Sequence, residues 1–527
     1  MRIIVRILLF FLLSTVLFSK AVQYSFASEQ SPHFTLIINQ VRGSECCDKG
    51  DLSWFTTQQK NLKNNTLVGN FAIRYDVLFL DKYITAIKND SRNDYGALLE
   101  ITPQLAADAG VTYKSEVAHW YEAQNVFLIG YSPAERKKLL DTYMQKYTAV
   151  LGKPPLFSSA WMIDPWSLAY LRSQYAITAH QMTREQFGTD SYTLYGGPVH
   201  YPYYPSKNWA MIPDETTSTT MPLILRQTIS DPVLIYGDTT SSYTSQPNDY
   251  FLRKDTSTYF KHLFYQAHAQ PNPYTFALVG LENSMEESAQ IEYESQLAEI
   301  KKWQEQDSAN TVVTVRQFQQ WFNTQKHSLS VYKGSTQKDS TEQAWWITTQ
   351  RYRARIRLSN NELAITDLRL YDPRFTDPYS ETTAQSLGWW IVPFVLDGSR
   401  YLEDSTGKTY IKNDMLKNRP ATIPEPIRIV LGTTKNPPTE TSENGRFTLQ
   451  LNAQNQITFY PENIELNSAQ PLTPTGKLPA PIAGLEWRSD TTAPAWGFTH
   501  SGNILQPFVS NPDLAKARET YRQLLFP

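Results

Sequence analysis

The stretch from residue 132 to residue 164, "SPAERKKLLDTYMQKYTAVLGKPPLFSSAWMID", decides the fold class. Ser132 followed by Pro133, with Glu135 at the third helical position, is a helix-start pattern, and Gly152 is a typical helix end. The apolar run 155–164 after it has the length and composition of a buried strand. A helix followed directly by a strand is the repeating unit of parallel sheets, so this stretch predicts an α/β fold.

The same unit recurs on both sides of this stretch. Further strands are predicted at 33–40, 69–78, 95–102, 176–182, 221–230 and 274–282, and helices at 51–65, 81–90 and 285–306. Seven or eight such units over about 290 residues favour a closed barrel over an open sheet. The first turn, "NQVRGSECC" (39–47), lacks the glycine spacing of a dinucleotide-binding sheet.

The C-terminal part of the chain has a different pattern. From about residue 340 the sequence alternates as strands do, at 344–372, 388–396, 425–433, 445–461 and 493–500. The predicted architecture is therefore an irregular (β/α)7-8, TIM-like barrel over 33–325. An all-β, sandwich-like C-terminal domain over 340–527 follows it.

The N-terminus has the features of an export signal. Within residues 1–27, Arg2 and Arg6 precede an apolar run from Ile7 to Phe18, and small residues precede a possible cleavage after Ala27. An uncleaved N-terminal anchor is the alternative. We expect a secreted or cell-envelope protein that touches the membrane, if at all, through this segment only. A net charge of −2 gives no reason to expect a nucleic-acid partner.

Aromatic residues make up 13% of the chain, and several lie in the polar stretch 196–209, "GGPVHYPYYPSKNW". Exposed rings with polar neighbours suit flat amphipathic ligands such as sugars. The alternative is that these rings pack loops over the rim of the barrel. A polysaccharide or oligosaccharide is the partner that we expect.

Three segments carry a resemblance to a known superfamily: "FTLIINQ" (34–40), "LVGNFAIRYDVL" (67–78) and the stretch from Tyr131 to Ala179. In order and spacing the barrel half resembles the glycoside hydrolase/deacetylase superfamily, which includes polysaccharide deacetylases and family-57 glycosidases. A β-rich region after the barrel is also similar to those glycosidases. The resemblance implies a (β/α)7 barrel that acts on carbohydrate.

The sequence departs from the metal-dependent deacetylases at their ligand positions. Asn39-Gln40 stand where those proteins carry an Asp-Asp pair, and "LLEITPQLAADAG" (98–110) has Glu100 but no histidine. We therefore predict no metal and no cofactor, and a deacetylase with unusual ligands stays an alternative. The other alternative is a catalytically inert barrel that binds cell-surface polysaccharide.

Glycosidases need two carboxylates that face one bond. The family-57 resemblance implies that this pair follows strands four and seven, where Asp164 and Glu282 stand with the letters exchanged. We expect Asp164 to be the nucleophile or base and Glu282 the proton donor. The alternative is that each residue caps the helix that follows it.

Other residues near strand ends and in loops are candidates for substrate binding. They are Arg42, Glu45, Asp48, Arg74, Asp76, Glu100, Trp161, Asp190, Tyr195, His200, Tyr203, Tyr204 and Trp209. His119 and His180 are expected to be structural. Cys46 and Cys47 could form a vicinal disulfide, stay as free thiols or join a metal site, with the disulfide or a structural loop favoured.

Overall fold

The computed structural model describes most of the chain. The described residues are 31–45, 52–114, 122–187, 193–235, 243–326, 328–380, 382–384, 389–398, 401–403, 405–406, 408–411, 425–467, 474–475 and 496–510. No helix in these ranges is long and apolar enough to cross a membrane.

A parallel sheet forms the N-terminal half. Its strands are β1 (His33–Val41), β2 (Asn70–Arg74), β3 (Asp94–Leu98), β4 (Ser158–Ser159), β5 (Ala179–Thr183), β8 (Leu223–Gln227), β9 (Thr275–Val279) and β10 (Asn310–Val313). They follow the order β1-β2-β3-β4-β5-β8, while β9 lies on the other edge of β1. β10 pairs with the first half of β1 and β2 with its second half.

The barrel closes almost completely between β8 and β9. Just after β8, the Ile229 N–H donates to the Leu278 carbonyl at 3.2 Å, and Thr228 Oγ1 donates to the same oxygen at 2.9 Å. In the first half of β8, the edge is instead paired with Tyr203 of a preceding loop. We call this junction the seam of the barrel.

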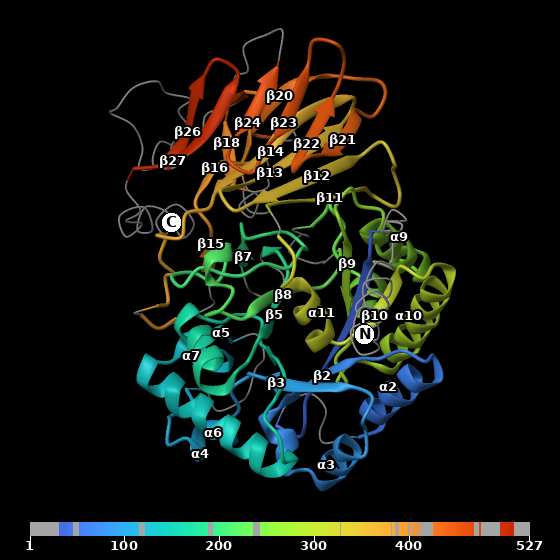
Figure 1. Ribbon diagram of the computed structural model, residues 1–527, viewed down its shortest axis with the longest axis vertical. Coiled ribbons are helices and arrows are strands. Elements are labelled where there is room, and N and C mark those ends of the chain that lie inside the picture. The colour runs from blue at the N-terminus through green and yellow to red at the C-terminus, as the bar shows by residue number, and fades with distance from the viewer. Residues whose placement is uncertain are drawn as a thin grey trace, which may run out of the picture.

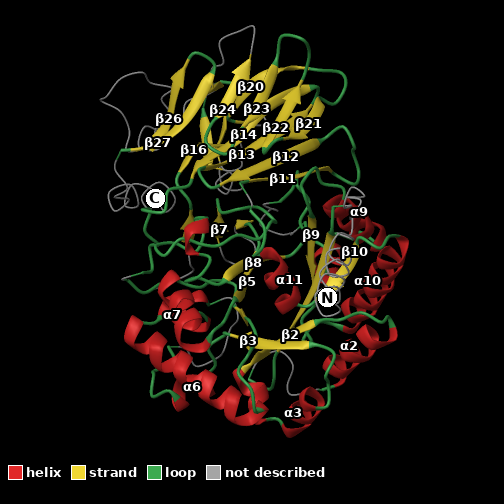
Figure 2. Cartoon of the chain, in the orientation of Figure 1, coloured by secondary structure: helices red, strands yellow, loops and turns green. Residues whose placement is uncertain are grey.

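The helices pack around this sheet, most of them on its outer face (Figure 2). They are α2 (Ser53–Asn64), α3 (Asp81–Lys88), α4 (Pro103–Asp108), α5 (Ala123–Val126), α6 (Pro133–Leu151), α7 (Pro165–Tyr175), α8 (Pro247–Leu252), α9 (Ser257–His268), α10 (Glu287–Gln306) and α11 (Val315–Phe322), with 3₁₀ turns η1 (Tyr75–Phe79), η2 (Leu128–Gly130) and η4 (Glu215–Thr217). The predicted start of α6 is confirmed, because Ser132 and Glu135 form a reciprocal capping box.

Two larger antiparallel sheets make up the C-terminal domain. The first contains β11 (Leu329–Ser335), β12 (Gln343–Thr349), β13 (Tyr352–Ser359), β14 (Glu362–Leu370), β20 (Arg428–Thr433) and β25 (Pro474–Thr475), with β16 (Phe394–Asp397) also on β14. The second contains β21 (Thr439–Glu443), β22 (Arg446–Gln450), β23 (Gln456–Phe459), β24 (Ile464–Asn467), β27 (Ile504–Val509) and β26 (Trp496–Ser501). The predicted fold class, an α/β barrel followed by a β-sandwich, is confirmed.

Two small sheets complete the architecture. β17 (Tyr401–Glu403) pairs with β18 (Thr409–Ile411) and β19 (Glu425–Pro426). In the other, β7 (Thr193–Tyr195) of the barrel half pairs with β6 (Gln186–Phe187) on one edge and with β15 (Trp389–Ile391) of the C-terminal half on the other edge.

The sandwich packs on the barrel at the seam (Figure 1). The Asn272 side chain, just before β9, donates to the Val331 carbonyl of β11 and accepts from the Val331 N–H, both at 2.8 Å. The His200 ring stacks on Tyr332 with centroids 4.3 Å apart. Strand β11 therefore covers the opening that β8 and β9 leave between them.

Candidate functional site

Charged side chains gather where four barrel strands end. Arg42 follows β1, Arg74 closes β2, Glu100 follows β3 and Glu282 follows β9, with Asp76 two residues beyond Arg74. All five are buried, with exposed fractions of 2–5%. The carboxyl ends of parallel strands meet on one face of a barrel, which is the face that carries the active site in barrel enzymes. We call these five residues the mouth cluster.

Arg42 is the centre of the mouth cluster. Its Nε and Nη2 donate to Glu100 Oε2 at 2.8 Å and Oε1 at 2.5 Å, which is a bidentate pair. Its Nη1 donates to Glu282 Oε2. The guanidinium therefore joins the end of β3 to the end of β9.

Arg74 makes a second bidentate pair. Its Nε and Nη2 donate to Asp76 Oδ1 at 2.9 Å and Oδ2 at 2.7 Å, and its Nη1 reaches Glu100 Oε2 at 3.4 Å. Two arginines thus face three carboxylates, which leaves one net negative charge in the mouth cluster.

Two asparagines hold the strand ends in place. Asn283 accepts from the Arg42 N–H at 2.9 Å and donates to the Arg42 carbonyl at 3.0 Å. Asn39 Oδ1 accepts from the Leu281 N–H at 3.0 Å and from the Tyr293 hydroxyl at 2.7 Å. These residues stitch the end of β9 to β1, and our sequence interpretation did not find that role for either of them.

The arginines set the charge of two carboxylates. Burial alone would raise the pKa of Glu100, but Arg42 and Arg74 outweigh it and hold that pKa below its ordinary value. Burial also opposes the charge of Asp76, whose pKa is nevertheless lowered by Arg74 and by the backbone N–H groups of Glu45 and Gly43. Both groups are therefore ionised at neutral pH.

Glu282 and Glu45 are the carboxylates with unused oxygens here. Within the described residues, Glu282 Oε1 makes no hydrogen bond, while Oε2 is held by Arg42. Glu45 is half-buried and its Oε1 accepts from the Gln104 N–H at 2.8 Å, but Oε2 has no partner in the described chain. The Glu45 N–H donates to Asp76, so Glu45 adjoins the mouth cluster.

Asp164 lies at the start of α7 and has a different set of partners. Its Oδ1 accepts from the Ser167 N–H at 2.9 Å, its Oδ2 accepts from the Ser167 hydroxyl at 2.7 Å, and Arg136 lies 3.1 Å away. Both charged groups are fully buried. These are the contacts that the helix-cap alternative predicts. None of them is with the mouth cluster. The catalytic role of Asp164 stays a prediction.

The loop 196–209 lies at the seam rather than among the strand ends. His200 Nε2 is bonded to the Phe276 carbonyl, and burial lowers the pKa of this ring to about 4. Tyr203 and Tyr204 line a cavity there, and Trp209 is buried. These residues do not contact the mouth cluster.

The remaining predicted residues divide into two groups. Trp161 is half-buried, and His180 is buried against Ser158, with its pKa lowered to about 3 by desolvation. Outside the described residues lie the segment 1–27, Cys46, Cys47, Asp48, His119 and Asp190, and the side chain of Tyr195 is not described either.

The described residues do not provide the metal site of a deacetylase. They contain no group of three or more histidine, cysteine, aspartate or glutamate side chains that could hold a metal ion. Asn39 stands at the expected ligand position, and its Oδ1 is already engaged by two hydrogen bonds. The donor set of the described residues therefore does not fit such a metal.

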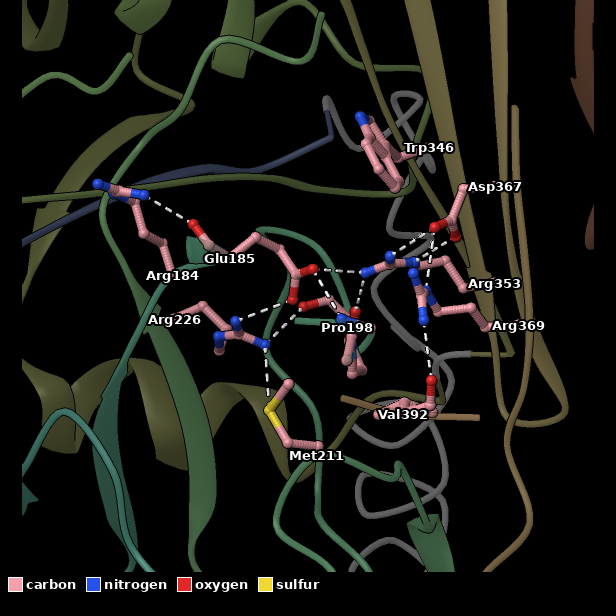
Figure 3. Close-up of polar contacts among 12 residues, drawn as sticks. Arg184, Glu185, Pro198, Met211, Arg226, Trp346, Arg353, Asp367, Arg369 and Val392 are labelled. Carbon is pink, nitrogen blue, oxygen red and sulfur yellow. Dashed lines mark hydrogen bonds and ion pairs between the residues drawn. The ribbon is translucent and has the colours of Figure 1, made fainter. Parts of the chain in front are cut away.

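A second charged cluster joins the two domains (Figure 3). Glu185 accepts from Arg226 of β8 at 3.1 Å and from Arg353 of β13 at 2.8 Å. Arg353 continues to Asp367 at 3.1 Å, and Arg369 bridges Asp367 and Asp397 at 3.0 and 2.7 Å. All of these side chains are at most 2% exposed, and we call them the interface cluster.

Comparison with known proteins identifies the fold but no close relative. No family model and no curated protein matches the chain. A crystal structure of a proposed glycoside hydrolase/deacetylase from Parabacteroides distasonis is similar over 69% of this chain and 91% of that one, with a TM-score of 0.52 and 13% identity. A proposed polysaccharide deacetylase from Mycobacterium smegmatis matches over 56% of this chain and 92% of its own, with a TM-score of 0.33 and 10% identity.

The first of these structures defines the class of fold. The chain has the same barrel fold as this structure, which is the fold that the sequence resemblance implied. At 13% identity the likeness concerns the fold, and the chemistry has to be argued from the residues of this chain.

Proposed function

We propose that the protein is a carbohydrate-active enzyme that hydrolyses glycosidic bonds at the barrel mouth. The observation that carries the proposal is the mouth cluster, which places buried carboxylates at the carboxyl ends of β2, β3 and β9, joined by the arginines that follow β1 and close β2. This is the face on which barrel enzymes do their chemistry, and paired carboxylates are the groups that glycoside hydrolysis requires.

In this proposal Glu282 is the charged carboxylate, acting as nucleophile or base. Its ion pair with Arg42 suits a carboxylate that works in its ionised form, and Oε1 is left for the reaction. This reverses the role that we expected for Glu282 from the sequence. The reason is geometric: Glu282 Oε2 already accepts from Arg42 Nη1, whereas Oε1 is left for the reaction.

Glu45 is the proposed proton donor. It has no arginine partner in the described chain, and its Oε2 is buried without a hydrogen bond. It would give its proton to the glycosidic oxygen as the bond to the anomeric carbon breaks. Either Glu282 attacks that carbon, or a water attacks and passes its proton to Glu282.

The second candidate function is carbohydrate binding without catalysis. The observation that favours it is the saturation of the mouth cluster, in which both oxygens of Asp76 and of Glu100 are already bonded to arginine. Such a network could serve only to hold the strand ends together under a binding surface.

Hydrolysis of a panel of polysaccharides and oligosaccharides, compared between wild type, Glu282→Gln and Glu45→Gln, tests the proposal. We expect each variant to lower kcat by about 10²–10⁴-fold, the usual contribution of a positioned acid or base. Glu299→Gln on α10, whose carboxylate pairs with Lys261 at 3.0 Å, is the matched control and should keep full activity.

Two results would contradict hydrolysis at this site. Turnover by Glu282→Gln at the wild-type rate would remove the carboxylate from the mechanism. Binding of saccharides by wild type without any turnover would favour the inert barrel. The configuration of the released sugar, followed by NMR, distinguishes direct attack by Glu282 from attack by water.

Export is the last part of the proposal. It is supported by the charged and apolar pattern of residues 1–27 alone. We expect the protein in the medium or cell envelope, and recovery of the full chain from the cytoplasm of its own cells would contradict this.

A further inference from the structure

A cavity of about 490 Å³ lies where the barrel seam meets the sandwich. The barrel contributes Tyr201, Tyr203, Tyr204, Tyr274 and Phe322 to its walls, and the sandwich contributes residues from the turns β12–β13 and β21–β22. Ligand sites of roughly 300–1,000 Å³ are typical, and domain interfaces are a preferred place for them. The cavity thus has the size and position of a binding site.

This cavity is separate from the mouth. Tyr274 lies directly before β9, whereas Glu282 lies three residues after it. The two residues are eight positions apart in the sequence, which corresponds to at most about 26 Å of extended chain. A ligand in the cavity therefore approaches the amino end of β9, the opposite end from the mouth cluster.

The aromatic wall of the cavity is held rigidly. Tyr274 meets Tyr201 edge to face at 5.6 Å and Phe322 at 6.3 Å, and Phe322 meets Tyr204 at 6.0 Å. Asn272 donates to the Tyr201 hydroxyl at 2.7 Å while it also binds the backbone of β11. A wall fixed in this way loses little conformational entropy when a ligand binds.

The chemistry of the walls selects the class of ligand. The tyrosine rings are 3–5% exposed, so only small apolar parts of them reach the cavity, and these lie beside polar groups, a combination that suits a sugar ring. The polar lining carries two acidic and two basic side chains, which are Glu215, Glu443, Lys326 and Arg446. It therefore has no surplus of positive charge that would select a polyanion. Gln350 adds an amide whose oxygen accepts from the Glu215 N–H at 3.2 Å and whose nitrogen donates to Glu215 Oε1 at 3.5 Å, which leaves one amide hydrogen and one lone pair for a ligand.

We infer that this cavity is a second saccharide site, which binds a neutral oligosaccharide away from the mouth. The inference rests on the proposed carbohydrate chemistry but not on hydrolysis. A site of this kind would hold one part of a polysaccharide on the enzyme while another part reaches the mouth.

Blocking the cavity tests this inference. Ser442 lines the cavity on the exposed strand β21, whereas its neighbour Thr441 is not part of the lining and points to the other side of the strand. Ser442→Trp should fill the entrance, and Thr441→Trp is the matched control. Gln350→Ala is the second cavity variant, because it removes a polar group without adding bulk.

Calorimetric titration of the full chain with maltohexaose, cellohexaose and chitohexaose gives the readout. We expect wild type to bind at least one hexaose, Ser442→Trp to bind it at least tenfold more weakly and Gln350→Ala severalfold more weakly. Thr441→Trp should bind as wild type does.

The outcomes separate this inference from the proposed function. Loss of binding in Ser442→Trp supports the cavity even when no hexaose is hydrolysed. Wild-type binding by both cavity variants, loss of binding in Glu282→Gln alone, or no binding of any hexaose by wild type would overturn it. Binding of a proline-rich decapeptide in preference to every hexaose would also overturn it.

Discussion

Asp164 and Arg136 form an ion pair that is fully removed from water between α6 and α7. Arg136 also donates to the carbonyls of Leu128 and Tyr131, so it stays partly satisfied without the carboxylate. Removing one member of a buried ion pair is costly because the other charge is left without its partner. The contacts of Asp164 therefore indicate that this residue stabilises the fold.

Replacing Asp164 therefore has a predicted effect on stability. Asp164→Ala should lower the free energy of unfolding by about 3 kcal/mol or more, since it removes a helix cap and leaves Arg136 without its carboxylate. Urea denaturation followed by circular dichroism measures the change. Asp214→Ala is the control, because Asp214 caps the short turn η4 without an ion pair and should cost only about 1 kcal/mol.

The opposite result would restore the role predicted from sequence. Asp164→Asn keeps an oxygen that can cap Ser167 but removes the charge. If this variant lost hydrolytic activity while its free energy of unfolding matched wild type, Asp164 would belong to the catalytic machinery after all.

The mouth cluster shows what the sequence could reveal about the candidate site. Glu282, Glu100 and Arg74 were each candidates because they stand near the ends of predicted strands, and the structure brings them together. Asp164 also follows a predicted strand, but β4 is only two residues long and the chain enters α7 at Asp164. An aspartate before Pro165 is expected both for a catalytic carboxylate at a strand end and for a helix cap, so the sequence could not distinguish these two roles.

At the scale of elements, β13 and β14 carry charged residues that are buried. Arg353 and Arg355 alternate with Ala354 and Ile356, a pattern that predicts one polar face in contact with water. Both faces of β13 are instead buried over most of its length, since the sandwich rests against the barrel. Local periodicity cannot reveal this, because the covering surface comes from residues far away in the sequence.

Asp397, the last residue of β16, has a raised pKa although it forms an ion pair with Arg369. Burial raises the pKa of Asp397 above its ordinary value, since it outweighs the attraction of Arg369, and the nearby charge of Asp367 acts in the same direction as burial. The pKa of Asp367 itself is lowered, because Arg353 and Arg369 outweigh its own burial. The two carboxylates therefore make opposite contributions to the pH dependence of stability.

In wild type, the stability of the fold should decrease as the pH rises and Asp397 loses its proton. We predict that this decrease is absent in Asp397→Asn. A carboxyl whose pKa is higher in the folded state stabilises the fold below its unfolded pKa of about 4, and this contribution is lost as the pH rises through the folded value. Relative to Asp397→Asn, the melting temperature of wild type should fall between about pH 4 and pH 7. Thermal melts across this range measure the difference, and a constant offset between the two proteins would contradict the prediction.

At the scale of the whole molecule, the two domains are built to act as one unit. The fold class of each could be predicted, since alternating helices and strands differ clearly from strands alone. The way they dock could not be predicted, because it depends on the seam between β8 and β9 and on ion pairs such as Glu185 with Arg353, which are 168 residues apart. The placement of Tyr203 and Tyr204 at the seam cavity follows from the same unpredicted contact.

Arg353 is the residue through which this coupling can be measured. It lies between Glu185 of the barrel half and Asp367 of the sandwich, and also donates to the Gly197 carbonyl at 2.8 Å. Replacing it by methionine leaves both carboxylates buried with one arginine each, a loss of about 3–5 kcal/mol for a broken buried pair. Much of this loss falls on the interface, so barrel and sandwich should no longer unfold together.

Differential scanning calorimetry of the full chain should therefore show one transition for wild type and two for Arg353→Met. Arg357→Met is the matched control, because Arg357 lies on the same strand four residues on, is 28% exposed and pairs with Glu342 within the sandwich. A partly exposed pair of this kind contributes at most about 1 kcal/mol. A single transition in Arg353→Met at the temperature of Arg357→Met would show that the interface cluster does not couple the domains.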